Sequence, residues 1–242
     1  MIDIHCHILP GVDDGAENLR EALLMARLAR NSGTRTIIAT PHFGYGEPGD
    51  GVEAFWQCLN RFREKLRQDQ IELEVLPGME LLCTHRLEKQ LELGEYIPLA
   101  ESRYLLTEFY FDEQTHQMEQ MLSAVAQRGL CPVIAHPERY DAVQRDPAFV
   151  RDWIEQGWGI QINAGSLLGN LGEAARHTAH WLVRHGCVHV VASDAHGMEF
   201  RTPQLDRARE YLEDHFGEDC AQALLWENPR RILENLSLPR YC

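Results

Sequence analysis

The sequence predicts an α/β fold whose parallel strands curl into a seven-stranded (β/α)7 barrel. Three observations predict it. Apolar segments alternate with helical segments through all 242 residues, most of these apolar segments end on a histidine or an acidic residue, and two such endings lie near opposite ends of the chain. Strand–helix alternation implies a parallel sheet with right-handed crossovers. An open doubly wound sheet shares that alternation. Side chains that follow the first and last strands, however, meet easily at one site only if the sheet curls round.

Seven apolar segments account for the predicted strands, one fewer than in a standard (β/α)8 barrel. In chain order they read IDIH, TRTIIA, LEVLPGM, YLLTE, PVIAH, GIQIN and VHVVAS. Short, nearly continuous apolar runs of this kind are typical of parallel strands that are buried on both faces. The predicted strands cover residues 2–5, 34–39, 73–79, 104–108, 132–136, 159–163 and 188–193.

Helical patterns fill the intervals between these strands. In the first interval, Leu19, Leu23 and Ala26 recur close to the helical period. The predicted helices cover residues 17–31, 52–67, 114–127, 147–156, 170–185, 204–216, 218–226 and 229–234. Because the sequence contains no linker, internal repeat or low-complexity tract, we expect residues 1–242 to form a single domain.

The composition argues against several classes of protein. A formal charge of −14 makes a nucleic-acid backbone an unfavourable partner. No apolar run approaches membrane-spanning length and the N-terminus lacks the regions of a signal peptide, so we expect no membrane insertion. The seven cysteines are odd in number and form no Cys-x-x-Cys pair, which predicts reduced thiols in the cytoplasm.

Two pairs of ligand-type side chains follow the first and last strands. His5 and His7 are separated by one residue, and alternate side chains of a strand share a face, so both imidazoles should point the same way. Asp194 and His196 repeat this spacing after the last strand. Imidazoles and carboxylates grouped on one face are suited to a metal ion, so each pair predicts part of a metal site.

Four intervening strands also lead to a histidine or a glutamate. These residues are His42, Glu80, Glu108 and His136. Barrel enzymes place their chemistry at the rim formed by the carboxyl ends of the strands. The sequence therefore predicts that all these side chains share one metal centre at that rim.

These residues, with the Asp13–Asp14–Gly15 turn, resemble the motifs of the polymerase and histidinol phosphatase (PHP) family. Within that family, the stretches SRYLLTEF, PVIAHPERYDA, VHVVASDAH and ENPRRIL are most similar to the metal-dependent tyrosine phosphatases of bacterial capsular and exopolysaccharide loci. The resemblance covers essentially the whole chain. It implies a distorted, TIM-like barrel of the PHP type, with seven strands and a trinuclear metal centre.

The resemblance also implies a set of metal ligands. One ion would take His5, His7, Glu80 and Asp194; a second would take Glu80, Glu108 and His136; the third would take Asp14, His42 and His196. Glu80 would thus bridge two ions. Asp13 competes with Asp14 as a ligand. The resemblance selects Asp14 and leaves Asp13 to the turn or to hydrogen bonding with a ligand.

The ligand types indicate which ions would bind. Histidine and carboxylate ligands without a thiolate suit Mn²⁺ best, with Fe²⁺ or Zn²⁺ as alternatives, and do not favour Ca²⁺. A divalent ion of this kind lowers the pKa of bound water from 15.7 to about 7, which supplies a nucleophile at neutral pH.

Two arginines and two aromatic residues complete the predicted site. Arg139 and Arg201 follow ligand residues on rim loops, and a guanidinium group matches the oxygens of a phosphate. The resemblance gives both a catalytic, phosphate-binding role. Phe43 and Tyr45 lie in the glycine-rich segment 43–51, which could act as a lid whose aromatic side chains flank a phenyl ring.

We therefore expect a cytoplasmic, metal-dependent protein-tyrosine phosphatase that acts on the tyrosine-rich tail of a bacterial tyrosine kinase controlling polysaccharide export. A small-molecule phosphatase of the same family, for example one acting on histidinol phosphate, is the main alternative. A PHP-type nuclease is less favoured because of the acidic composition. A non-catalytic metal-binding or docking module would need an incomplete ligand set.

Other reactive side chains are assigned no part in the reaction. Cysteine-based tyrosine phosphatases place an arginine six residues after the nucleophile, and no cysteine here has one. His85 follows Glu80 and is a weak candidate for substrate contact. The remaining clustered histidines precede the last strand at the other end of the predicted barrel, where a surface or capping role is expected: His177, His180, His185 and His189.

Overall fold

The computed structural model describes residues 1–43 and 51–239. Its strands are β1 (Ile2–Cys6), β2 (Thr36–Ala39), β3 (His42–Phe43), β4 (Glu74–Pro77), β5 (Glu80–Leu82), β6 (Tyr104–Glu108), β7 (Cys131–Ala135), β8 (Gly159–Asn163) and β9 (Val190–Ala192). All seven predicted strands are present, with ends that differ by a few residues.

The α-helices are α1 (Leu19–Asn31), α2 (Gly51–Gln68), α3 (Leu87–Leu93), α4 (Thr115–Gln127), α5 (Asp141–Arg145), α6 (Val150–Glu155), α7 (Ala164–Leu167), α8 (Glu173–Arg184), α9 (Asp206–Phe216), α10 (Glu218–Gln222) and α11 (Asn228–Leu233). Short 3₁₀ helices are η1 (Leu99–Glu101), η2 (Pro137–Arg139) and η3 (Pro147–Phe149), and η4 (Ala223–Glu227) is a π-helical turn. The sequence patterns did not predict α3, α5 and α7, which are too short for a clear helical period.

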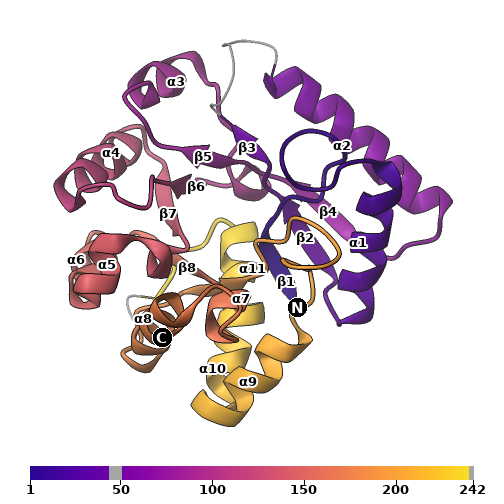
Figure 1. Cartoon of the computed structure of the whole chain (residues 1–242). Helices are drawn as coiled ribbons and strands as arrows, with labels where there is room; N and C mark the ends of the chain where they lie inside the picture. The colour runs from indigo at the N-terminus through magenta and orange to yellow at the C-terminus, as the bar shows by residue number, and fades with distance from the viewer. Residues whose placement is uncertain (44–50, 240–242) are drawn as a thin grey trace.

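The strands pair only in parallel and lie in the middle of the molecule, with helices around them (Figure 1). β1, β2 and β4 form one sheet, and β3, β5, β6, β7, β8 and β9 form a second sheet in that order. The predicted α/β fold with parallel strands is therefore confirmed.

The prediction of seven uninterrupted strands, in contrast, is not confirmed, because two of the predicted strands are each followed by a second, short strand. Pro41 separates β2 from β3, and Gly78 lies between β4 and β5. Proline has no N–H group to donate to a strand ladder, so pairing stops there. A Cβ atom at Gly78 would lie 2.5 Å from the Ile38 side chain, so glycine lets the two neighbouring strands approach closely. These two interruptions divide the strands between two sheets.

The first and last strands meet at their carboxyl ends. The backbone N–H of Asp194 donates to the carbonyl of His5 at 2.8 Å, and the N–H of His7 donates to the carbonyl of Ala195 at 2.9 Å. Cys6 and Ala195 form a parallel bridge. This contact brings the two predicted ligand pairs to the same rim, as the sequence pattern requires.

Buried side chains cover both faces of the strands. One cluster collects residues of β1, β2, β6, β7 and β9 on the inner side, among them Ile4 and Ile38, and Ile232 of α11 packs against them. Two larger clusters lie between the strands and the surrounding helices. Burial on both faces explains why these strands read as continuous apolar runs rather than alternating ones.

Candidate metal centre

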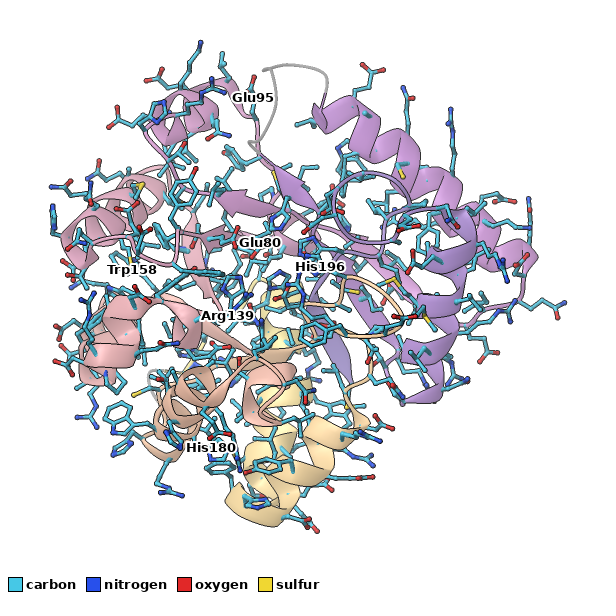
Figure 2. The ribbon with its side chains drawn as sticks, viewed as in Figure 1. Glu80, Glu95, Arg139, Trp158, His180 and His196 are labelled. Atoms are coloured by element: carbon cyan, nitrogen blue, oxygen red, sulfur yellow. The ribbon has the colours of Figure 1, made fainter. Side chains whose placement is uncertain are left out.

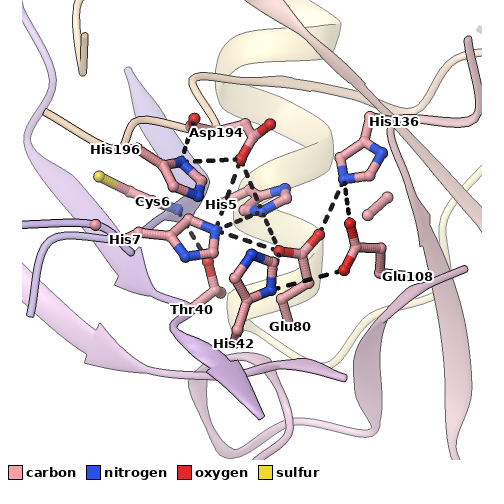
Figure 3. A network of polar contacts seen from close by, with 12 residues as sticks. His5, Cys6, His7, Thr40, His42, Glu80, Glu108, His136, Asp194 and His196 are labelled. Carbon is pink, nitrogen blue, oxygen red and sulfur yellow. Dashed lines mark hydrogen bonds and ion pairs between the residues drawn. The ribbon is translucent and has the colours of Figure 1, made fainter. Parts of the chain in front are cut away.

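The predicted ligands converge at the carboxyl ends of the strands. Glu80, Arg139 and His196 lie near the middle of the ring of helices, whereas Trp158 and His180 lie towards its periphery (Figure 2). The close view in Figure 3 shows histidine and carboxylate side chains from β1, β3, β5, β6 and the loops after β7 and β9 pointing toward one another.

His5 and His7 lie on the same side at the end of β1. Their Nε2 atoms are 3.1 Å apart, and both residues are fully buried. The Cys6 side chain lies between them in sequence but packs into the outer core cluster. The predicted alternation of side chains is therefore confirmed at this position.

A first group of ligand atoms surrounds the two Nε2 atoms. Oε2 of Glu80 lies 3.1 Å from Nε2 of His5 and 3.2 Å from Nε2 of His7. Oδ1 of Asp194 lies 3.4 and 3.6 Å from the same two nitrogens. Ligand atoms bound to one ion at about 2.0–2.2 Å would be separated by roughly 3.0–3.6 Å. The four side chains therefore have the spacing of a metal site, and the four atoms lie within 4.8 Å of one another.

The second carboxylate oxygen of Glu80 faces a second group. Oε1 of Glu80 lies 3.0 Å from Nε2 of His136, which lies 3.6 Å from Oε1 of Glu108. Nδ1 of His42 lies 3.2 Å from Oε2 of Glu80 and 3.6 Å from Oε2 of Glu108. Glu80 therefore stands between two groups of ligand atoms, as a bridging carboxylate would.

A third group lies at the exposed side of the centre. Oδ1 of Asp14 is 3.4 Å from Nε2 of His196 and 3.6 Å from Nε2 of His42. These atoms and a ring nitrogen of His7 lie within 4.8 Å of one another. His42 thus contributes one ring nitrogen to this group and the other to the group around Glu108, which the sequence pattern did not indicate.

Hydrogen bonds set the protonation of three imidazoles. Nδ1 of His5 lies 2.9 Å from Oε1 of Gln161, and Nδ1 of His7 lies 2.7 Å from Oδ2 of Asp13. Nδ1 of His196 lies 3.0 Å from the carbonyl oxygen two residues earlier in the chain. Because each Nδ1 faces an acceptor, it carries the proton, and each Nε2 presents a lone pair to the centre.

The inward-facing atoms need a cation. Oε2 of Glu80, Oε2 of Glu108 and Oδ1 of Asp194 are buried and accept no hydrogen bond within the described part of the chain. Buried polar atoms are almost always paired. Here negative oxygens and imidazole lone pairs face each other at the distances given above. Divalent cations would pair all of them, so the residues fit the metal centre that the sequence predicts.

The pKa values of the carboxyl groups reflect this crowding. Burial and the nearby negative charge of Glu80 raise the pKa of Glu108 to about 7. Burial alone would raise the pKa of Glu80 as well, but the imidazoles of His5, His136 and His7, when they carry a proton on Nε2, hold it well below its usual range. A bound cation would favour the charged form of both carboxylates.

Two proposed ligands have unusual backbone conformations. The φ angle is +34° at His136 and +49° at Asp194, in a region that residues other than glycine rarely adopt. Each residue follows the end of a strand, β7 or β9. Such conformations persist only where the surroundings impose them, and they cluster at functional sites.

Similarity to known proteins identifies the family of the chain. Residues 1–234 match the family described as capsular polysaccharide synthesis, CpsB/CapC. The chain belongs to the CpsB/CapC family.

Relatives in this family are similar along their whole length. The chain is 37% identical over 240 residues to the tyrosine-protein phosphatase YwqE of Bacillus subtilis. The alignment covers 99% of this chain and 94% of the relative. It is 32% identical over 238 residues to the tyrosine-protein phosphatase CpsB of Streptococcus pneumoniae, and this alignment covers 96% of the chain and 98% of the relative.

A solved structure agrees with these relatives. It comes from work on YwqE from Bacillus subtilis and CpsB from Streptococcus pneumoniae, described as unique metal-dependent tyrosine phosphatases. It matches the present fold with a TM-score of 0.92 and 36% identity, covering 100% of this chain and 98% of the other.

In this CpsB/CapC protein, the two predicted arginines lie beside the centre. Arg201 donates from a terminal guanidinium nitrogen to Oδ2 of Asp194 at 3.0 Å, and Arg139 lies 3.5 Å from the same oxygen. The guanidinium carbon of Arg139 lies 4.5 Å from the centre of the Phe111 ring. Both guanidinium groups are partly exposed, so they remain accessible to a phosphate.

Sequence reasoning missed several residues of this CpsB/CapC site. Phe111 stacks under Arg139, and its position three residues after Glu108 offered no distinct signal. Gln161 and Asn163 are buried next to the ligands. Their polar side chains alternate at the end of an otherwise apolar strand, and that pattern could have revealed them.

The other candidates divide into two groups. Tyr45 lies outside the described residues, and only the backbone of Phe43 is described, so neither predicted aromatic contact is placed. Among the described residues, His85 and the four histidines near the last strand belong to none of the ligand groups. His180 bonds Tyr211 and the carbonyl of Leu167, and His189 is buried among backbone hydrogen bonds.

None of the described cysteines forms a disulfide. Burial raises the pKa of the Cys6 thiol well above its ordinary value, so it does not provide a thiolate.

Within residues 1–43 and 51–239, no helix is both long enough and apolar enough to span a bilayer.

Proposed function

We propose that this CpsB/CapC protein is a metal-dependent protein-tyrosine phosphatase. The observation that carries the proposal is the position of Glu80, whose two carboxylate oxygens face two groups of buried ligand atoms while two arginines lie alongside. Relatives along the whole chain are named tyrosine-protein phosphatases.

We assign three divalent ions to the centre, with Mn²⁺ as the preferred ion and Fe²⁺ or Zn²⁺ as alternatives. The ligands would be His5, His7, Glu80 and Asp194 for the first ion, Glu80, Glu108 and His136 for the second, and Asp14, His42 and His196 for the third. When bound, such ions would provide a water molecule with a lowered pKa and would offset negative charge on a phosphate.

The protein's own side chains would bind and orient the phosphate ester. Arg139 and Arg201 approach the centre from neighbouring loops, and their guanidinium forks match phosphate oxygens. Asp194 holds both guanidinium groups through Oδ2. This pre-orientation lowers the entropic cost of binding and places positive charge where negative charge develops during phosphoryl transfer.

A peptide substrate has room next to this centre. A cleft of about 670 Å³ lies between α1 and residues 197–201, and His196 and Arg201 line it. We propose that it accommodates the residues beside a phosphotyrosine. We further propose that the substrate is the tail of a bacterial tyrosine kinase controlling capsular or exopolysaccharide synthesis, and that the reaction takes place in the cytoplasm.

We also propose that residues 1–242 form one domain, a distorted seven-stranded barrel of the PHP type. In this interpretation β2 with β3, and β4 with β5, each count as one strand position. The parallel contact between Cys6 and Ala195 would close the barrel.

A metal-screened assay tests the function. The purified chain would be stripped of metal, reloaded separately with Mn²⁺, Fe²⁺ or Zn²⁺, and assayed with a phosphotyrosine peptide, a phosphoserine peptide and histidinol phosphate. We expect kcat/KM to be highest for the phosphotyrosine peptide and to be lost without metal. A higher kcat/KM for histidinol phosphate would replace the proposal with a small-molecule phosphatase.

A further inference from the structure

Strand β8 lies beside the metal centre but supplies none of the proposed ligands. It lies between β7 and β9, and residues of the loops that follow both of those strands are proposed ligands. Ile160 and Ile162 of β8 point outward into the core. The alternate residues Gln161 and Asn163 are polar and fully buried on the side of the metal centre.

These two amides connect two proposed ligands of the same ion. Oε1 of Gln161 lies 2.9 Å from Nδ1 of His5. Nε2 of Gln161 donates to Oδ1 of Asn163 at 2.9 Å, and Nδ2 of Asn163 donates to Oδ2 of Asp194 at 2.6 Å. A continuous line of hydrogen bonds therefore runs from His5 to Asp194.

The direction of donation is the same along the whole line. His5 donates to Gln161, Gln161 donates to Asn163, and Asn163 donates to the carboxylate of Asp194. Rotating either amide by half a turn would place two acceptors or two donors face to face. The line therefore keeps the proton of His5 on Nδ1, leaves Nε2 as the ligand atom, and occupies Oδ2 of Asp194 so that Oδ1 faces the ion.

A further buried residue holds this line in place. Oε1 of Glu138 accepts hydrogen bonds from the backbone N–H of Asn163 at 2.9 Å and from the hydroxyl of Ser166 at 2.7 Å. Glu138 belongs to η2, which directly follows the proposed ligand His136. The end of β8 is therefore hydrogen-bonded both to the loop after β7 and to the proposed ligands His5 and Asp194.

We propose that Gln161 and Asn163 are positioning residues that set the metal affinity of the His5–Asp194 site by acting as one unit. The proposal rests on the metal centre of the proposed function. Apolar side chains of similar size would fill the same space, as Ile160 and Ile162 do on the opposite face. They would leave Nδ1 of His5 without an acceptor. Oδ2 of Asp194 would lose its shortest hydrogen bond and keep only its contacts with Arg201 and Arg139. Loss of such hydrogen-bonding partners typically weakens metal binding by roughly 10- to 100-fold.

The test measures metal binding and needs no substrate. Metal-stripped wild type, Gln161→Leu, Asn163→Leu and the double variant would be titrated with Mn²⁺ and with Zn²⁺ in competition with a chelator. Gln90→Leu is the matched control, because Gln90 of α3 is also a buried glutamine but lies outside the ligand groups. We expect each single variant to lose roughly 10- to 100-fold in affinity for one ion per chain, and Gln90→Leu to lose none.

Two further comparisons separate positioning from a general packing effect. If the line acts as one unit, the double variant should lose no more affinity than the weaker-binding single variant. Gln161→Glu keeps an acceptor for His5 and should bind metal better than Gln161→Leu. It also serves as the second variant if Gln161→Leu does not fold. Additive losses, or unchanged affinity in the folded variants, would overturn the proposal. A wild type that binds metal but does not hydrolyse phosphotyrosine would instead overturn the proposed function alone.

Discussion

Asp13 holds His7 in a fixed orientation: Oδ2 of Asp13 lies 2.7 Å from Nδ1 of His7. The same oxygen accepts the backbone N–H of His42 at 2.8 Å, and Oδ1 accepts that of Gly15 at 3.0 Å. Burial by itself would raise the pKa of Asp13, but the hydrogen bond from His7, together with those from the backbone of His42 and Gly15, lowers it to about 2. Because both oxygens are engaged, the neighbouring Asp14, whose Oδ1 faces His42 and His196, is the better placed ligand.

This difference predicts opposite effects for two adjacent substitutions. Asp14→Asn should remove one ion per chain, since it weakens a direct ligand. Asp13→Asn should keep the ion count but weaken metal affinity by roughly 10- to 100-fold, because His7 loses its anionic acceptor. Elemental analysis and chelator competition on the purified variants measure both quantities. If Asp13→Asn lost an ion and Asp14→Asn did not, Asp13 rather than Asp14 would be the metal ligand.

Glu80 is the residue whose loss should affect the centre most. Glu80→Ala removes the oxygens that face both His5 and His136. We expect loss of at least one ion and of most activity, with the fold retained, as measured by metal content, turnover and circular dichroism. Glu88→Ala on the exposed surface of α3 is the control. Full metal content in a folded Glu80→Ala variant would contradict the bridging role.

The arginines should contribute mainly to binding of the phosphate. A hydrogen bond to a charged group is worth about 1.5–3 kcal/mol, so Arg139→Ala or Arg201→Ala should lower kcat/KM by roughly ten- to a hundred-fold. Lysine restores the charge but not the planar fork, so Arg→Lys variants should recover activity only in part. Phe111→Leu removes the ring beneath Arg139 and should lower kcat/KM less than Arg139→Ala does. Wild-type kinetics in both alanine variants would exclude a role for the arginines.

The buried thiol next to the ligands should be dispensable. Cys6 packs into the outer core, and burial raises its pKa, so Cys6→Ser should keep most of the phosphatase activity. Chelation of metal should abolish activity in both wild type and variant. If Cys6→Ser were inactive while the metal-stripped wild type remained active, a thiol-based mechanism would have to replace the metal-dependent one.

His189 predicts a pH dependence of stability that does not involve the metal ligands. The backbone N–H of Ile160 donates to Nδ1 of His189, and Nε2 of His189 donates to the carbonyl of Pro239, so the ring is held neutral. Burial lowers its pKa from 6.5 to about 4. Between these two values the unfolded state binds more protons than the folded state does. Stability should therefore fall as the pH decreases from about 6.5 to 4, by on the order of 3 kcal/mol.

Denaturant unfolding of wild type and His189→Gln across this range isolates the effect. The variant should be less stable at pH 8, because it loses buried hydrogen bonds, but its stability should depend less on pH between 4 and 6.5. Equal pH dependence of the two proteins would show that His189 does not contribute.

Local sequence determined the type of fold and the positions where ligands could occur. Strand and helix periods are properties of neighbouring residues, so the seven strand segments and most helices were predictable. A His or Glu that directly follows a buried strand must lie at the rim of a parallel sheet. This is why His5, His42, Glu80 and His136 could be placed at one end of the fold before any distance was known.

Tertiary structure decided how those side chains are paired. The distance between His5 and Gln161, or between Glu80 and His136, depends on sheet curvature and strand register, which no local period encodes. His42 faces two ligand groups, because one ring nitrogen lies near Asp14 and the other near Glu80. Asp13 and Asp14 differ only in which way the turn after β1 points them. The alternating polar side chains of Gln161 and Asn163 are visible in the sequence, but their hydrogen bonds to His5 and Asp194 depend on the contact between the ends of β1 and β9, which only the tertiary structure establishes.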